Sequence, residues 1–364
     1  MPHIALLVLN GGASPCESDY QRGRKARLSM QSGAKIRGAA PLRTGLSGRE
    51  RPCSAMRAID ILGDGWAFLV LREAFFSVRR FDQILRHTQA PRAVLADRLD
   101  RLVRNGLLKK VRYQERPERF EYRLTPMSHD LYPAIVLMMN WGDRWLQTDG
   151  PPRRLIHKPC GSELIGKVIC SHCGEEISPR DVTPQAGPGM AEIESQPTER
   201  LRRPSDKDVY CRGRACSVAR TLSVIGNRWA ALTLREALSG ARRFDEFQAR
   251  TNLPTTTLTS RLRLFVENRV LKRVAYQDRP ARYEYRLTKM GYDLYGISTA
   301  LMAWGDRWTS EDKGRPLLLQ HNTCGHLFEP TIVCSCCAGA IDAHDVEVEE
   351  LARPEDTADK RATG

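Results

Sequence analysis

Two stretches of the chain decide its fold. Leu62–Leu85 reads LGDGWAFLVLREAFFSVRRFDQIL, and Ile225–Phe247 reads IGNRWAALTLREALSGARRFDEF. The segment Cys53–Trp145, which contains the first stretch, aligns without a gap on Cys216–Trp308, at a constant offset of 163 residues. Roughly half of the aligned positions are identical. Solenoid repeats have periods of roughly 20–50 residues, so this repeat is a duplicated domain. Two similar units in one chain can replace the two chains of a symmetric dimer.

The composition favours a polyanionic partner. The 364 residues are enough for about two to four domains, and their formal net charge is +14. A basic protein attracts phosphate over long distances, so nucleic acid is the expected partner. A basic protein whose charge serves only solubility is the alternative.

The ends and the middle of the chain have the composition of linkers. We expect a disordered basic leader over residues 1–50, a linker over 184–209 that contains four prolines, and a disordered tail over 349–364. A misassigned start codon would give the leader the same composition. No apolar run approaches the ~18 residues of a membrane helix, and Ile4–Leu9 is too short for a signal peptide. The expected location is cytoplasmic, without a membrane.

Each copy has the same predicted order of elements. In copy one, helices are expected at about Met56–Leu62, Trp66–Phe75, Phe81–His87 and Pro91–Arg104, strands at Leu108–Tyr113 and Phe120–Leu124, and a long helix at Met127–Leu146. Copy two repeats the strands at Leu271–Tyr276 and Tyr283–Leu287. The fold class is therefore mainly α with small β. It consists of tandem winged helix-turn-helix domains over 51–150 and 210–312, and each is followed by a short zinc-ribbon-like module, over 151–183 and 313–348.

Three motifs per copy resemble the HxlR family of bacterial transcription regulators. Besides the opening stretches, they are LADRLDRLVRNGLLKKVRYQERPERFEYRLTP from Leu95 with its counterpart from Leu258, and WGDRW from Trp141 and from Trp304. The resemblance implies a double-stranded DNA-binding transcription regulator in which terminal helices build a dimer interface. Relatives usually carry one domain and form homodimers. This chain carries two, so we expect repeat one to pair with repeat two within the chain.

The helix after Pro91 has the pattern of a reading helix. Leucines at i, i+4 and i+7 from Leu95 form a buried face, and short or hydrogen-bonding side chains occupy the other face, as a major-groove helix requires. A solvated face is the alternative. The candidate base-contacting residues are Arg92, Ala93, Asp97 and Arg101 in copy one, and Thr255, Thr256, Thr257, Ser260 and Arg263 in copy two.

The two reading faces differ in charge. Copy one offers Asp97 and Asp100, whereas copy two offers hydroxyl groups. We therefore expect an asymmetric operator with two unlike half-sites roughly one helical turn (~34 Å) apart.

The predicted hairpin turns are candidate wings. Each carries two arginines, which could enter the minor groove or hold phosphates; two solvated loop arginines are the alternative. The residues are Arg116, Arg119, Arg279 and Arg282.

The predicted long helix carries a heptad-like apolar stripe in both copies. One side can pack on its own domain and the other on the partner helix, although such a stripe is also typical of plain core. The stripe contains Met127, Leu131, Ala134, Met138, Trp141 and Trp145 in copy one, and Met290, Leu294, Ile297, Leu301, Trp304 and Trp308 in copy two.

A matched cysteine cluster follows each domain. The spacing His-x2-Cys-x9-Cys-x2-Cys occurs twice, and four nitrogen and sulfur ligands suit tetrahedral Zn²⁺ in a closed, structural site. His172, His326 and Cys336 are nearby alternatives as ligands. The candidate ligands are His157, Cys160, Cys170 and Cys173 in the first module, and His321, Cys324, Cys334 and Cys337 in the second.

Cys53 and Cys216 stand at matching positions before the first helix of each copy. In some members of the HxlR family a cysteine at this position senses oxidants, so both are candidate redox residues. A small buried hydrophobe is the alternative interpretation.

Two other function classes remain open at this point. One is a protein-interaction module built on degenerate winged helices, which the acidic face of copy one would suit. The other is a zinc-dependent hydrolase, which would need an open metal site and a general base; motifs such as His-Glu-x-x-His are missing from the sequence. We expect no enzyme. The sequence does not identify an effector.

Overall fold

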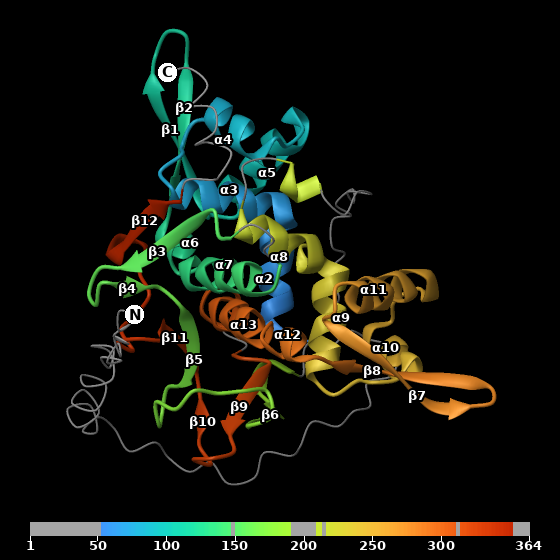
Figure 1. Ribbon diagram of the computed structural model, residues 1–364. Helices are drawn as coiled ribbons and strands as arrows, with labels where there is room; N and C mark the ends of the chain where they lie inside the picture. Colours follow the sequence, from blue (N-terminus) through green and yellow to red (C-terminus); the bar gives the residue numbers. More distant parts are fainter. Residues whose placement is uncertain (1–51, 147–149, 191–208, 213–215, 311–313, 352–364) are drawn as a thin grey trace, which may run out of the picture.

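The computed structural model describes residues 52–146, 150–190, 209–212, 216–310 and 314–351. Both repeats consist of helices followed by a two-stranded hairpin and a terminal helix (Figure 1), as predicted. Repeat 1 contains α2 (Ser54–Leu62), α3 (Gly65–Phe75), α4 (Phe81–Thr88), α5 (Arg92–Arg104), β1 (Leu108–Gln114), β2 (Arg119–Leu124), α6 (Pro126–His129) and α7 (Tyr132–Trp145). Repeat 2 contains α8 (Ser217–Ile225), α9 (Arg228–Leu238), α10 (Phe244–Thr251), α11 (Thr255–Glu267), β7 (Leu271–Asp278), β8 (Ala281–Leu287), α12 (Lys289–Tyr292) and α13 (Tyr295–Thr309).

The prediction of one long helix from Met127 to Leu146 is wrong. The chain forms the short α6, bends at Asp130 and Leu131, and restarts as α7. Pro133, the second residue of α7, has no N–H with which to continue the hydrogen bonds of α6. Repeat 2 bends at the equivalent Asp293 without a proline.

A tight turn separates the two helices of each helix-turn-helix. Gln89 after α4 and Asn252 after α10 adopt left-handed conformations, with φ of 55° and 52°. The predicted buried face of the second helix is confirmed, since Leu95, Leu99 and Leu102 are at most 1% exposed. Its counterparts Leu258, Leu262 and Phe265 are buried as well.

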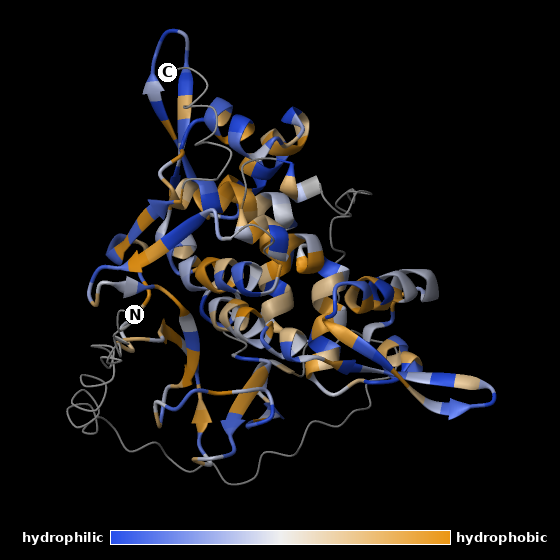
Figure 2. Cartoon of the chain, viewed as in Figure 1, coloured by the Kyte–Doolittle hydropathy of each residue, from blue (hydrophilic) through white to orange (hydrophobic). Residues whose placement is uncertain are grey.

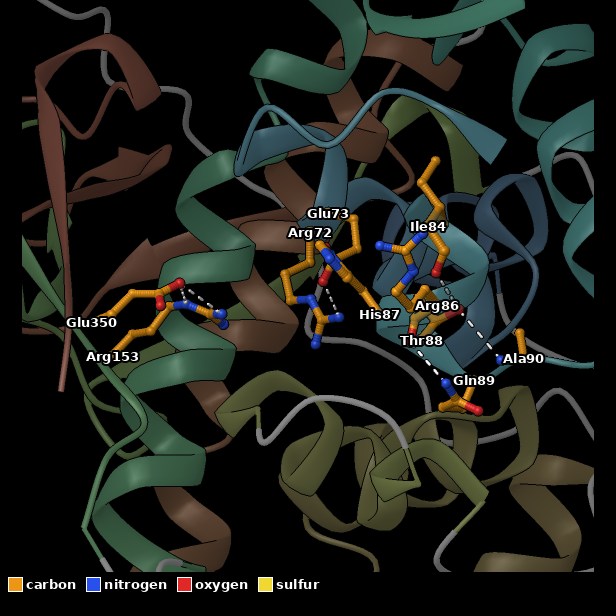
Figure 3. Close-up of polar contacts among 10 residues, drawn as sticks. All are labelled: Arg72, Glu73, Ile84, Arg86, His87, Thr88, Gln89, Ala90, Arg153 and Glu350. Atoms are coloured by element: carbon orange, nitrogen blue, oxygen red, sulfur yellow. Dashed lines mark hydrogen bonds and ion pairs between the residues drawn. The ribbon is translucent and has the colours of Figure 1, made fainter. Parts of the chain in front are cut away.

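A buried carboxylate joins α4 to α3 in repeat 1. Glu73 is fully buried, where it accepts from Arg72 and lies 2.7 Å from Nδ1 of His87 (Figure 3). A buried charge is tolerated only with such partners. The contact therefore fixes the position of the first helix of the helix-turn-helix.

The terminal helices of the repeats lie side by side at the centre of the molecule (Figure 1). Helix α7 packs against α8, and α13 packs against α2, so each terminal helix contacts the first helix of the other repeat. The indole Nε1 of Trp141 donates to the carbonyl of Met290 at 3.0 Å, and Trp304 donates to Met127 at 2.8 Å. The contacts are reciprocal, as in a two-fold dimer interface.

The rest of each WGDRW motif also faces the other repeat. A Cβ added to Gly142 would lie 2.2 Å from the carbonyl oxygen of Ser217, and one added to Gly305 would lie 2.1 Å from that of Ser54. Only glycine permits this backbone approach. Ser217 also donates from Oγ to Asp143.

The pKa of Asp143 is raised to about 6 by burial, and the hydrogen bond from Ser217 and the charge of Arg220 offset this effect only in part. Because the pKa is higher in the folded state than the ordinary 3.8, folding takes up a proton between these values. The destabilising effect of the buried charge is therefore fully present above pH 6 and is relieved as the pH falls.

The segments after the two terminal helices form shared sheets. The orders are β12-β3-β4, β10-β9-β6 and β11-β5, with all pairs antiparallel. Each sheet contains strands from both segments. The strands are β3 (Arg153–His157), β4 (Ser162–Glu163), β5 (Gly166–Cys170), β6 (Val182–Ala186), β9 (Leu317–His321), β10 (Leu327–Phe328), β11 (Pro330–Cys334) and β12 (Val346–Glu350).

The linker expected over 184–209 begins too early, because β6 and the 3-10 helix at Pro188–Met190 lie inside it. Pro184 is tolerated in β6 because this strand is at a sheet edge, where a missing N–H breaks no ladder. The expected tail likewise begins inside β12. The expected leader, residues 1–50, lies outside the described residues. Among the residues that are described, none of the helices is both long and apolar enough to cross a membrane.

Replacing Gly142 by alanine should weaken the packing of α7 on α8. The new methyl group would overlap a backbone carbonyl, and overpacking of this kind costs about 1–3 kcal/mol. Urea unfolding measures the free energy. Gly296→Ala in α13 is the matched control, because its Cβ would meet Val168 at an ordinary 3.4 Å. Equal stability of the two variants would contradict this account of the interface.

Candidate nucleic-acid interface and metal centres

The exposed face of α5 carries three of its four predicted reading residues, Arg92, Ala93 and Asp97. Asp97 pairs with Arg98, the next residue in the helix. The fourth, Arg101, is turned inward. Its guanidinium donates to the carbonyls of Asp60 and Ile61 at the end of α2, so it satisfies backbone groups that the helix end leaves without partners.

The exposed face of α11 is neutral at its start. Thr255, Thr256 and Ser260 are exposed, and Thr257 is half-buried. The hydroxyl of Thr255 accepts from Gln248 at 3.0 Å. Arg263 follows on the same helix and is exposed. Its Nε lies 2.8 Å from Oε1 of Glu267.

An ion pair that the sequence analysis missed holds α5 in place. Arg98 is 6% exposed and donates to both carboxylate oxygens of Asp64, at 3.0 and 2.9 Å. Asp64 also caps α3 through the N–H of Trp66. Repeat 2 has Asn227 at the equivalent position, where it caps α9 through Ala230. In the sequence, Asp64 belongs to GDGW in repeat 1, and repeat 2 has GNRW at the same place. The partner of Asp64 is 34 residues away, so neither motif indicates an ion pair.

The wings are exposed at their ends in both repeats, and Figure 2 shows these ends to be hydrophilic. The four predicted arginines, Arg116, Arg119, Arg279 and Arg282, are all exposed at the hairpin ends. In repeat 1 the wing also carries Arg112, whose guanidinium lies 3.5 Å from Glu118 and 3.8 Å from Glu115.

A cation–π contact anchors each hairpin to the start of the helix-turn-helix. The guanidinium of Arg80 lies 4.6 Å from the ring centroid of Tyr113, and that of Arg243 lies 4.6 Å from Tyr276. These contacts tie the wing to α4 and α10. The wing also packs on the reading helix, β1 on α5 and β7 on α11, so the wing and the reading helix form one head in each repeat.

The eight predicted metal ligands come together as two groups of four, but the grouping differs from the sequence expectation. One group is His157, Cys160, Cys334 and Cys337, and the other is Cys170, Cys173, His321 and Cys324. Within each group the ligand atoms lie within 4.8 Å of one another. Each group takes a His-x2-Cys pair from one module and a Cys-x2-Cys pair from the other, because β5 pairs with β11 across the modules. These two groups could hold metal ions.

The histidines have the orientation of ligands. Nδ1 of His157 lies 3.4 Å from the sulfur of Cys160 and 3.3 Å from that of Cys337, while Nε2 lies 3.2 Å from the carbonyl of Ala340. A backbone partner of this kind fixes the tautomer of metal-binding histidines. Nδ1 of His321 lies 3.3 Å from the sulfur of Cys173.

The cysteines differ in how readily they ionise: against the opposing effect of burial, hydrogen bonds from the backbone of Ser162 and from His157 lower the pKa of Cys160 to about 7. Burial raises the pKa of Cys170 and of Cys337 to about 11, and a neighbouring cysteine adds to the effect in each group. Thiolates at these positions would therefore need a cation to stabilise them at neutral pH. Tight turns after the cysteines bring the pairs together, with φ of 67° at Gly161, 74° at Gly174 and 72° at Gly325.

The alternative ligands do not join these groups. His172 and His326 stack on each other with ring centroids 3.7 Å apart. The sulfur of Cys336 lies 3.3 Å from the hydroxyl of Ser162.

The two candidate redox residues occupy equivalent N-terminal positions. Cys53 precedes α2 and is half-buried, whereas Cys216 precedes α8 and is buried. Their environments therefore differ, and a redox role for either remains a hypothesis.

Comparisons with known proteins agree with this architecture. The model of the HxlR-like helix-turn-helix family matches residues 61–150 and again 224–313. A transcriptional regulator of Mycobacterium bovis, Mb3122, is 50% identical over 146 residues, which are 40% of this chain and 92% of the relative. A regulator of Mycobacterium tuberculosis, Rv3095, matches equally well. The chain belongs to the HxlR-like helix-turn-helix family.

Two further similar proteins match a smaller part of the chain. The regulator sll1512 of Synechocystis is 33% identical over 27% of this chain and 73% of its own. The solved structure of PA1374 from Pseudomonas aeruginosa is 38% identical over 30% of this chain and 73% of its own, with a TM-score of 0.24. Because the family and the curated relatives are transcription regulators, the chain is a DNA-binding transcription regulator and not an enzyme.

Replacing Arg101 by alanine should reduce stability rather than DNA contact. Two carbonyls at the end of α2 would lose a charged donor, at a cost of about 1–3 kcal/mol in the free energy of unfolding. The salt dependence of DNA affinity should not change. A slope of log K against log salt that is shallower by about 1 would instead indicate a lost phosphate contact and contradict the structural role.

Proposed function

We propose that the two repeats act as an intramolecular pseudo-dimer that binds one DNA duplex with both heads. The observation that carries this proposal is the reciprocal set of WGDRW contacts, in which Trp141 and Trp304 each donate to the backbone of the other repeat. A second chain would have to displace these contacts in order to pair. The covalent link also gives the second head a high effective concentration at the DNA.

The two heads are unlike, which supports an asymmetric operator. At equivalent positions α5 has Asp97 and Asp100, and α11 has Ser260 and Arg263. Carboxylates repel the DNA backbone, whereas hydroxyls and a guanidinium can bind phosphates and base edges. Repeat 2 is therefore the stronger reader.

The wings differ in the same direction. Arg112 in repeat 1 lies close to Glu115 and Glu118, and repeat 2 has Ala275 and Ala281 in place of Arg112 and Glu118. Fewer carboxylates stand near the tip of the second wing, so its arginines meet less competition for phosphate. The acidic head of repeat 1 also fits a protein partner, which is the second candidate function for that repeat alone.

We further propose that each Cys/His group binds one structural Zn²⁺. Three sulfurs and one imidazole nitrogen are a donor set that zinc favours, and four protein ligands leave no open position for a catalytic water. His157 and Cys160 would share an ion with Cys334 and Cys337, and the other four residues would share the second. The metal would then fasten the two modules, and through them the two repeats. The six cysteines of these two groups are free thiols, which fits a cytoplasmic location.

The wing arginines test the DNA proposal. We expect Arg282→Ala to lower affinity for an operator fragment and to make the salt slope shallower by about 0.9. Arg119→Ala should have a smaller effect, because repeat 1 is the weaker reader. Arg154→Ala, an exposed arginine in β3, is the control and should leave the slope unchanged. Equal losses from both wing variants would contradict the asymmetry.

Footprinting and mass measurement test the pseudo-dimer. The chain should be a monomer in dilute solution and should protect two unlike half-sites with centres about one helical turn (~34 Å) apart. A perfect inverted repeat, or an obligate dimer of chains, would contradict the proposal. Full binding after the surface of α11 is changed, with the wing intact, would assign DNA recognition to repeat 1 instead.

Metal content distinguishes the exchanged grouping from ligand sets within one module. Native chain should contain two zinc ions. The double variant Cys160→Ser/Cys334→Ser removes ligands from one group only and should keep about one ion. Cys160→Ser/Cys173→Ser removes a ligand from each group and should keep none. The reverse result, measured by elemental analysis at matched folding, would show that each module binds its own ion.

A further inference from the structure

A cavity of about 380 Å³ lies beside the pairing helices. Its walls come from α2 and α3 of repeat 1, from α9 and α13 of repeat 2, and from β6 and β9 of the shared sheets. The volume is within the range of small-molecule sites, roughly 300–1,000 Å³. Protein interiors are otherwise close-packed, and voids larger than a water molecule are few.

The cavity exists because repeat 2 has smaller side chains than repeat 1 at equivalent positions. In repeat 1 the bulky residues are packed. The ring centroids of Phe75 and Tyr132 are 4.9 Å apart, the guanidinium of Arg153 lies over the ring of Phe76, and Ile135 is buried. In repeat 2 the replacements line the cavity. The pairs are Phe68 and Ala231, Phe75 and Leu238, Phe76 and Ser239, Ile135 and Ser298, and Val136 and Thr299.

The charged groups in the wall favour an anion. Asp64 is neutralised by its ion pair with Arg98, and Arg235 is paired with Glu236 at 2.7 Å. Arg250 also lines the cavity and donates to the carbonyl of Ser239 at 3.2 Å. Repeat 1 has His87 at this position. Arg250 therefore adds a third charged group to a wall that is otherwise apolar or neutralised. The carboxylate of Glu246, which interacts electrostatically with Arg250, is not one of the lining residues.

We infer that this cavity binds a small aromatic or aliphatic acid as an effector, with its apolar body among Met56, Leu234 and Met302 and its anionic group toward Arg250. A few polar groups in a mainly apolar cavity are typical of ligand sites. The remaining lining residues are in keeping with this chemistry, since most of them are apolar.

The position of the cavity links a ligand to DNA reading, and this step depends on the proposed function. Helix α9 lines the cavity through Ala231, Leu234 and Leu238, and it also packs against α10 and α11. Helix α2 also lines the cavity, packs against α13 and contacts α9. A ligand in the cavity beside α9 and α2 would therefore change the position of the stronger reading head relative to the pairing helices.

Two fluorescent probes test the site. 1-Anilinonaphthalene-8-sulfonate carries an anionic group, and N-phenyl-1-naphthylamine has the same rings without the charge. With the full, metal-loaded chain we expect one bound molecule of either probe, and at least tenfold tighter binding of the sulfonate. Arg250→Gln should remove this preference without weakening the neutral probe. An unchanged preference would overturn the assignment of the anionic group.

Filling the cavity with the residues of repeat 1 tests its location. Ala231→Phe and Ser298→Ile should each reduce the affinity of the neutral probe at least tenfold. Glu347→Gln, at an exposed residue of β12, is the control. Circular dichroism and metal content confirm folding, and if one variant fails to fold, the other decides. Unreduced affinity in a folded cavity-filling variant would overturn the site.

The effector role is tested separately, in a DNA-binding titration with saturating sulfonate. We expect operator affinity to change at least threefold in native chain and not in Ser298→Ile. Operator affinity that is the same with and without bound probe would overturn the effector role while leaving the cavity as a binding site. If native chain did not bind the operator even without the probe, the proposed function itself would be wrong.

Discussion

The rest of the structure depends on two close helix contacts, α7 on α8 and α13 on α2, each of which requires a glycine. Gly142 lies against the backbone of α8 and Gly305 against that of α2, with no room for a Cβ. At this separation the indoles of Trp141 and Trp304 reach carbonyls of the opposite repeat. This contact geometry sets the position of one reading head relative to the other and brings the strands of the two segments together. The cavity beside α13 also needs the smaller side chains of repeat 2.

Local features of the fold could be predicted because their causes are local. Leu95, Leu99 and Leu102 are spaced for one buried helix face, and their burial needs no knowledge of distant residues. The wing was predictable for the same reason. The bend at Asp130 was not, because the apolar stripe continues across it, and the carboxylate there accepts from Trp308 of the other repeat.

Only those features of the site that lie within one segment of the sequence could be predicted. The eight ligand residues were recognisable from their spacing, but the two halves of each group have the same pattern in both modules, so spacing cannot say which halves meet. Strand pairing between β5 and β11 decides this. The helix position of Arg101 predicts a DNA contact, but the sequence pattern cannot show that its side chain donates to two carbonyls of α2. The ion pair of Arg98 with Asp64 was missed because its partners are far apart in sequence.

The shared sheets constrain how the protein can be made. Strand β3 pairs with β12 near the end of the described chain, and β5 pairs with β11. A ribosome that has released only the first repeat and its module has produced β5 and β6 without their partner strands, and half of each ligand set. Native structure in this region must wait until synthesis is almost complete, so a prematurely terminated product would expose unpaired edges and free thiols to proteases.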